Sequence, residues 1–316
     1  MPLPLIPVIL WGAAAITAGV GIKKGIDAKS DFDRARGIGS DAESRHAKGR
    51  DEIEKNRAQT QESLEALGLR KVEVFTNQIK YLVDAIKKGR SQLKDFELGV
   101  SVDQLKEYER LVIGSMNLER GLAGGAVGGA LAAMGAYGAV GSLATASTGA
   151  AISGLSGVAA TNATLAWLGG GALSAGGFGM AGGMLALGGI ALGPALAVGG
   201  FMMASKAEEA LTKARSYSAE VDVALAEMEK IKVVLKAIRS HAAEVDAVIL
   251  RLVEAFEQVK VPDGSDQTAF ERMIAVGKAL KGALDIKILD EAGSPVKGLD
   301  VQCKGLLEVL GPEVES

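Results

Sequence analysis

The strongest constraint on this chain is a long run of residues without charge. From Gly121 to Ser205, 85 consecutive residues include no Lys, Arg, Asp, Glu or His, although charged residues make up 23% of the whole chain. This run holds 24 of the 42 glycines. An apolar run of about 18 or more residues without charge is a candidate for crossing a bilayer. The run is therefore expected to meet hydrocarbon, or else to form a dry core between protein helices.

Many glycines of the uncharged run recur every four residues. On a helix this spacing leaves a flat strip, which lets another helix backbone approach closely. Each glycine also costs about 1 kcal/mol in helix propensity and lacks the methylenes that would anchor a span in lipid. The pattern predicts helices that pack against copies of themselves, or that stay sheltered in protein before they insert. The predicted packing residues are Gly121, Gly125 and Gly129, Gly124 and Gly128, Gly179 and Gly183, and Gly189 and Gly193.

Long helices are predicted on both sides of the uncharged run. After it, apolar residues alternate in steps of three and four over seven heptads, which is typical of a coiled-coil helix in a stalk or an antiparallel hairpin. Before it, residues 23–120 are amphipathic, and Ser101 with Gln104 forms a candidate capping box. The predicted stripe is Ala210, Ala214, Tyr217, Val221, Ala224, Met228, Ile231, Leu235, Ile238, Ala242, Val245, Ile249, Leu252, Phe256 and Val259.

The predicted organisation has five regions and no strands, so the fold class is all-α. Residues 1–22 form an apolar helix and residues 23–120 an amphipathic region. Residues 121–205 form the membrane or core helices and residues 206–261 the long helix. Residues 262–316 form a small helical region, with helices at about 268–289 and about 297–310. We expect the chain to form a homo-oligomer, because strips and stripes of this kind need partners.

The charges that border the apolar segments predict a topology. The segment 1–22 is followed by Lys23 and Lys24, the reverse of the order in a secretory signal, so we expect it to be retained. It either spans the membrane with the remainder in the cytoplasm, or lies buried or at the interface. Arg120 and Lys206 flank the uncharged run, which favours an even number of spans. The simplest solution is a hairpin of residues 121 to about 140 and about 173 to 204.

No catalytic or metal-binding pattern stands out. The match to a dinucleotide fingerprint at Gly177–Gly182 follows no predicted strand and lacks the acidic residue expected downstream. His46 and His241 are isolated, and Cys303 is the only cysteine, which excludes an intrachain disulfide. The net charge of -3 favours no nucleic-acid surface. We expect no enzymatic activity, no cofactor and no metal.

One segment resembles a known family. Residues Ala163–Ala214, "ATLAWLGGGALSAGGFGMAGGMLALGGIALGPALAVGGFMMASKAEEALTKA", resemble the glycine-rich channel effectors of the Hailong anti-phage system. The layout is also similar to that of the apolipoprotein L channel-forming proteins. The resemblance implies a homo-oligomeric channel, a tetramer, held shut by a short DNA oligomer from a partner nucleotidyltransferase and opened on infection. Such a ligand would need basic or amide groups near the core, and the candidates are Lys23, Lys24, Arg120, Asn162 and Lys206.

The leading hypothesis is a membrane-permeabilising channel or pore-forming effector of bacterial anti-phage defence, acting by abortive infection. It would reside in the inner membrane, with most of the chain in the cytoplasm, and would be gated by a ligand or partner. The alternative is a soluble coiled-coil scaffold whose glycine-rich core only seals an assembly. A third possibility, a phage tail tape-measure protein, would specify a very short tail at 316 residues.

Overall fold

The computed structural model describes residues 22–92, 99–122, 128–144, 207–262, 265–290 and 294–311. These ranges are almost entirely helical and contain no strand, only an isolated β-bridge between Leu289 and Pro295. The all-α prediction is confirmed for this part of the chain. The helices in chain order are α1 (Ile22–Val74), the π-helix η1 (Phe75–Ile79), α2 (Lys80–Gln92), α3 (Val102–Leu122), α4 (Gly128–Ala144), α8 (Ala207–Val259), α9 (Gln267–Asp285), α10 (Leu299–Leu307) and the 3-10 helix η6 (Glu308–Leu310).

The predicted capping box starts α3. The backbone N–H of Gln104 donates to Oγ of Ser101 at 3.1 Å, and the backbone N–H of Ser101 donates to Oε1 of Gln104 at 2.9 Å. Two donors at the helix start, which have no partner within the helix, are thereby satisfied. The capping box is confirmed.

Helix α9 ends one turn before the predicted position near residue 289. Ile286 leaves the helical conformation, with φ -54° and ψ 127°. The chain that follows then bonds to itself, since the N–H of Val296 donates to the carbonyl of Ile288 at 2.9 Å. The apolar residues after Asp285 continue the helical spacing in the sequence. The backbone of this segment nevertheless pairs with residues outside the helix, and the helix ends.

The chain divides into two compact units, and α1 and α8 contribute to both. The first unit comprises Met1–Arg45 and Gly193–Asp222, and the second comprises His46–Leu192 and Val223–Ser316. In the first unit, Arg45 of α1 forms an ion pair with Asp222 of α8, and its Nη2 donates to Oγ of Ser218 at 2.9 Å. The two long helices therefore contact each other within this unit.

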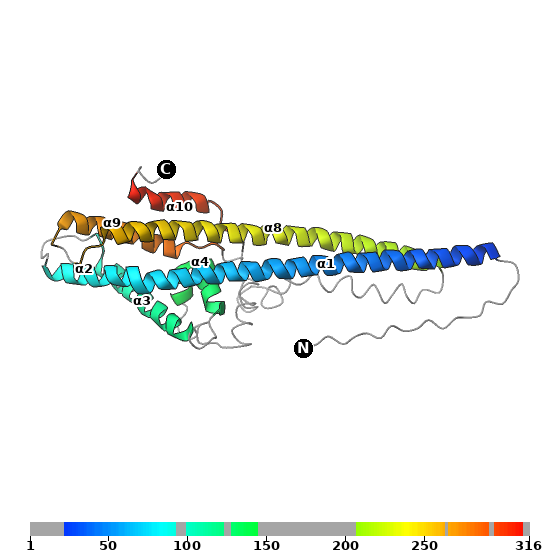
Figure 1. Cartoon of the computed structure of the whole chain (residues 1–316), viewed down its shortest axis with the longest axis horizontal. Helices are drawn as coiled ribbons and strands as arrows, with labels where there is room; N and C mark the ends of the chain where they lie inside the picture. Colours follow the sequence, from blue (N-terminus) through cyan, green and yellow to red (C-terminus); the bar gives the residue numbers. More distant parts are fainter. Residues whose placement is uncertain are drawn as a thin grey trace. The chain divides into compact units, whose positions relative to one another are not determined.

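In the second unit, α1 and its continuation run parallel to α8 (Figure 1). Nζ of Lys232 lies 2.7 Å from Oε2 of Glu52, and Nε2 of Gln78 donates to Oε1 of Glu257 at 2.8 Å. The residue numbers rise together along both helices, as they do only in a parallel pair. The partner of α8 here is thus not the antiparallel neighbour of a hairpin.

The predicted apolar stripe of α8 is buried within the chain. All of its residues are buried except Ile231 and Val259, which are half-buried, while the charged residues between them are mostly exposed. Sustained spacing of three and four residues places these side chains on one face of the helix. The stripe is covered without a second copy, so the predicted homo-oligomer stays a prediction.

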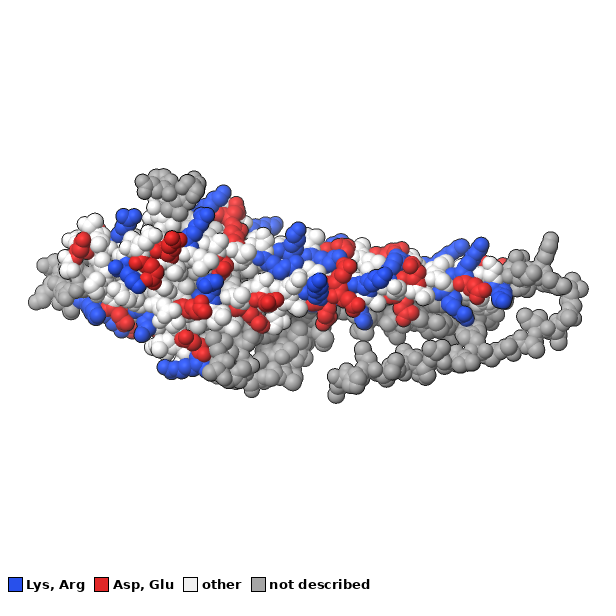
Figure 2. Space-filling model, in the orientation of Figure 1, with Lys and Arg blue, Asp and Glu red and all other residues white. Residues whose placement is uncertain are grey.

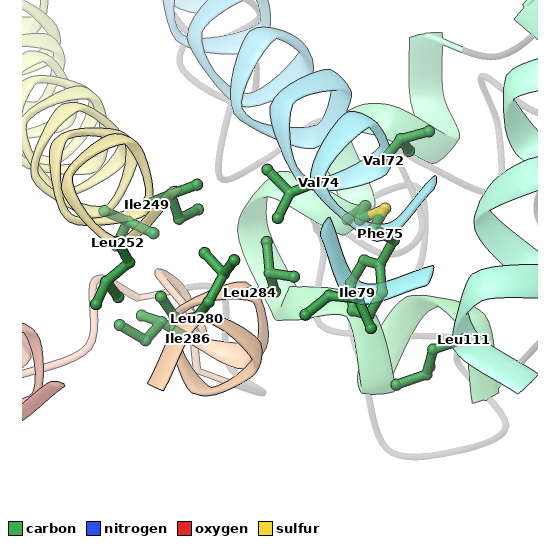
Figure 3. Close-up of a cluster of buried hydrophobic side chains, with 14 of the residues drawn as sticks. Val72, Val74, Phe75, Ile79, Leu111, Ile249, Leu252, Leu280, Leu284 and Ile286 are labelled. Atoms are coloured by element: carbon green, nitrogen blue, oxygen red, sulfur yellow. The ribbon is translucent and has the colours of Figure 1, made fainter. Parts of the chain in front are cut away.

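The hydrophobic core of the second unit lies where several helices converge (Figure 3). Its side chains come from η1, α2, α3, α4, α8, α9 and α10, and the end of α1 adds Val72 and Val74. Burial of each large apolar side chain stabilises the fold by about 1.5–3 kcal/mol. Residues from these elements include Phe75, Ile79, Leu111, Ile249, Leu252, Leu280 and Leu284.

Candidate functional site

The predicted packing and ligand residues fall mostly at element ends or outside the described ranges. Gly121 is half-buried near the end of α3, and Gly128 and Gly129 begin α4. Arg120 is exposed in the last turn of α3, and Lys23 and Lys24 belong to the first turn of α1. The remaining candidates lie outside the described residues, so the ligand assignment stays a prediction. They are Gly124, Gly125, Asn162, Gly179, Gly183, Gly189, Gly193 and Lys206.

Apart from Gly121 and Leu122 at the end of α3, helix α4 is the part of the uncharged run that the structure describes, and it is packed inside the second unit. It contacts α3 and α9 as well as α1. None of the helices in the described ranges has both the length and the hydropathy needed to cross a bilayer. In this structure α4 packs against other helices of the same chain. The buried residues of α4 are Leu131, Ala132, Ala133, Met134, Gly135, Ala136, Gly138 and Ala139.

Two glycines bring the backbones of α1 and α4 into direct contact. A Cβ atom added to Gly68 of α1 would overlap the carbonyl group of Leu131, 2.6 Å from its carbon. A Cβ atom added to Gly135 of α4 would overlap the carbonyl group of Leu64, 2.9 Å from its carbon. Reciprocal glycines of this kind allow helices to pack at the smallest separation. The contact joins α4 to the charged helix α1 of the same chain, and neither glycine is among the predicted packing residues, so packing between copies stays a prediction.

A break at Gly138 ends the regular part of α4. Gly138 has φ 74° and ψ 174°, a conformation that is essentially restricted to glycine. Carbonyl groups just before such a break lose their regular helical partners. The carbonyl of Ala136 instead accepts from the N–H groups of Ile288, at 2.7 Å, and Leu289, at 3.2 Å. The segment after α9 therefore caps α4 from outside the helix.

Lys71 of α1 caps the neighbouring carbonyls of α4. Its side chain is completely buried, and Nζ donates to the carbonyls of Met134 and Gly135 at 3.3 Å and of Ile286 at 3.1 Å. Within the described residues, no carboxylate lies at ion-pairing distance from Lys71. A lysine buried in this way loses its hydration shell, and it gains in return the carbonyl dipoles and the more distant charge of Asp285. Lys71 thus ties α1, α4 and the end of α9 together at an electrostatic cost.

The charges around Lys71 form a chain that leads to α3. Burial lowers the pKa of Lys71 to about 7, and the charge of Asp285 opposes this shift. Burial raises the pKa of Asp285, and Lys281, which lies 2.6 Å from its Oδ2, opposes that shift. Lys281 is also 2.9 Å from Oε1 of Glu107. Although burial lowers the pKa of Lys281, these two carboxylates outweigh it and raise the pKa above its ordinary value.

We call this cluster the α4 docking site. Sequence analysis missed it, although one signal was present, because Lys71 falls on an apolar helical stripe between Leu67 and Phe75. A lone lysine on such a stripe usually extends its ammonium to water. Nothing local distinguishes a buried lysine from one that reaches the surface. The α4 docking site consists of Gly68, Lys71, Gly135, Gly138 and Asp285.

A second candidate is a pocket of about 290 Å³ beside η1 and the end of α8. Four of its polar side chains, those of Thr76, Gln78, Glu257 and Lys260, already have partners within the chain. Glu257 accepts from Gln78 and forms an ion pair with Lys260, whose Nζ lies 5.7 Å from the centre of the Tyr81 ring. A pocket with satisfied polar groups offers a ligand few new interactions. The α4 docking site is the stronger candidate.

The surface and the comparisons name no partner. Figure 2 shows basic and acidic side chains interspersed over the visible face, without a large area of one sign. Searches against known protein families, curated proteins and solved structures find no match to this chain. A functional conclusion has to come from the uncharged run and from the way that α4 is held.

Proposed function

We propose that the protein is a membrane-permeabilising effector that stores the beginning of its uncharged run in a helical body until it is triggered. The observation that carries this proposal is the packing of α4. Helix α4, which has no charged residues, lies between α1, α3 and α9. On release, α4 would separate from these charged amphipathic helices, which would stay folded. Storage of this kind explains how one chain combines 85 uncharged residues with an otherwise charged sequence.

The way in which α4 is held favours release. Most of its buried side chains are alanines, and each buried methylene or methyl group contributes only about 0.8 kcal/mol. The close backbone contact at Gly68 and Gly135 adds van der Waals attraction, but Lys71 adds a desolvated charge that works against docking. A helix held by small side chains and a costly lysine can dock and undock at modest free energy.

The resemblance of Ala163–Ala214 to the Hailong channel effectors supports the same conclusion. On this proposal the uncharged run assembles in the bacterial inner membrane as a homo-oligomeric channel, and the trigger is infection by phage. The tetrameric state and a gating DNA oligomer belong to the proposal through the resemblance alone. The helices α1 and α8 would remain in the cytoplasm, where interspersed surface charges keep them hydrated (Figure 2).

The alternative function is a structural scaffold. It is favoured by one observation, namely that the chain itself covers both α4 and the apolar stripe of α8. A scaffold would elute from size-exclusion columns without detergent as a discrete species and would not float with lipid vesicles. An effector would bind to vesicles under at least one condition.

Expression of the protein in bacteria is expected to depolarise the inner membrane, as measured with a potential-sensitive dye. A matched pair of variants tests whether the uncharged run is responsible. Leu187→Arg places a charge in the middle of the second predicted span, which costs about 2.5–3.5 kcal/mol on insertion and should abolish depolarisation. Leu187→Ala keeps the run neutral, so this variant should still depolarise the membrane. An unchanged potential at high expression of the original chain, or full depolarisation by Leu187→Arg, would contradict the proposal.

A further inference from the structure

We infer that the outer face of α8 binds a second, antiparallel copy of this chain and forms a homodimer. This face carries a second helical stripe, which we call the outer stripe of α8. In the proposed function the dimer would be the first step of homo-oligomeric assembly, and in this respect the inference rests on that proposal. The interface itself involves only α8 and requires no membrane. The outer stripe consists of Val223, Ala226, Lys230, Val233, Ala237 and Ser240.

The spacing of the outer stripe is that of a coiled-coil seam. Its residues alternate in steps of three and four, as those of the buried stripe do, but they come two positions later in the sequence. Two residues turn an α-helix by about 200°, so the two stripes lie on opposite sides of α8. The buried stripe packs against the rest of the chain. The outer stripe therefore gives α8 a second seam, about five turns long, that faces away from this packing.

The apolar side chains of this face are exposed to solvent. Val223 is 64% exposed, Val233 is 68% exposed and the adjacent Val234 is 42% exposed. These three valines are among nine large hydrophobic side chains that are exposed in the part of the chain that the structure describes. Single apolar residues on a surface need no partner, whereas a row at heptad spacing is typical of a helix that packs against another helix.

The charges beside the outer stripe favour an antiparallel second copy. Full overlap of the two outer stripes sets the register, in which Lys230 of each copy faces Val233 of the other. Glu229 of one copy then lies opposite Lys236 of the other, and the two-fold axis repeats this pair. Lys236 is exposed and forms no ion pair within the described residues, and the Glu229 side chain is 66% exposed although it pairs with Lys232.

A parallel second copy would meet an unfavourable contact at the same face. In a parallel pair in register, each stripe residue faces its own equivalent, so Lys230 would lie against Lys230 of the other copy. The Lys230 side chain is 71% exposed on the single chain and pairs only with the neighbouring Glu227. Like charges at the centre of the seam disfavour this arrangement, and opposite charges beside the seam favour the antiparallel one.

Sedimentation equilibrium of the full chain over a micromolar concentration range tests the interface. Val233→Glu would place a carboxylate in the middle of the seam, so the association constant of the dimer should fall about tenfold or more. Val301→Glu is the matched control, because this valine of α10 is also 68% exposed and lies outside the stripe. It should associate as the original chain does. A monomeric original chain, or equal association of the two variants, would overturn the dimer.

An exchange of charges tests the antiparallel orientation. Glu229→Lys alone places like charges opposite each other twice in the dimer, and the association constant should fall about tenfold. Lys236→Glu in the same chain restores opposite charges in the antiparallel pair, so the double variant should dimerise as the original chain does. In a parallel pair these two positions do not face each other, and a double variant without recovery would overturn the antiparallel arrangement.

The outcomes separate the dimer from the proposed function. Dimers that fail to depolarise bacteria keep the interface and remove the effector. Depolarisation by a chain that stays monomeric removes the interface alone. If the chain stays monomeric and Val233→Glu weakens its binding to phosphatidylglycerol vesicles, the outer stripe binds lipid and the dimer is wrong.

Discussion

Replacing Gly68 or Gly135 by alanine is expected to lower the free energy of unfolding by about 3 kcal/mol, the upper part of the range for overpacked interiors. Each added methyl group would overlap a backbone carbonyl of the opposite helix, and no rotamer change can move a carbonyl away. The helices α1 and α4 would have to separate, and the bonds from Lys71 would lengthen. Urea denaturation followed by circular dichroism measures the change.

The matched control for this pair is Gly305→Ala. Gly305 lies in helix α10, and a Cβ atom at this position would meet no other atom within 4 Å. The same substitution should therefore stabilise the protein by up to about 1 kcal/mol through helix propensity alone. The double variant Gly68→Ala with Gly135→Ala should lose less stability than the sum of the two single losses, because one separation of the helices relieves both overlaps. Equal stability of Gly68→Ala and Gly305→Ala would disprove the close contact.

Gly138→Ala should be about as harmful, with an expected loss of about 3 kcal/mol from backbone strain and overlap together. The positive φ of Gly138 disfavours any residue with a Cβ atom, and this atom would lie 2.8 Å from the carbonyl carbon of Asp285. The substitution therefore destabilises both the backbone conformation at the break in α4 and the contact of α4 with the end of α9. Thermal unfolding together with denaturant titration would measure the loss.

Gly99→Ala separates strain from overlap. Gly99 also has a positive φ, 61°, but a Cβ atom there would meet no other atom within 4 Å. Its replacement should cost only about 1–2 kcal/mol, the conformational penalty by itself. If both variants lose the same stability, the contact between Gly138 and Asp285 contributes nothing to docking.

Local patterns in the sequence predicted those parts of the fold that local physics determines. The stripe of α8 repeats over the whole helix, so its buried face followed from spacing alone. The capping box joins Ser101 and Gln104, which are three residues apart and need no other part of the chain. The end of α9 was placed too late because backbone pairing between Ile288 and Val296 leaves no mark in helical periodicity.

Contacts between distant segments could not be predicted in the same way. The glycine spacing indicated close helix packing, but it marks a face of a helix and does not say what covers that face. The actual contact pairs Gly135 with a glycine of α1, Gly68, from the charged part of the sequence. The parallel direction of α1 and α8 also depends on the path of the chain between them. Lys71 was missed because its burial results from three elements that meet only in the folded state.

The central claim is that docked α4 belongs to a reserve of uncharged chain that permeabilises membranes after release. The most direct measurement is dye release from vesicles of phosphatidylethanolamine and phosphatidylglycerol, under conditions where the original chain and Gly138→Ala both keep their helical content. We predict that both proteins release the dye and that Gly138→Ala is faster, because its α4 is held less firmly. If neither protein releases dye or floats with the vesicles, the claim is wrong and the chain is a scaffold.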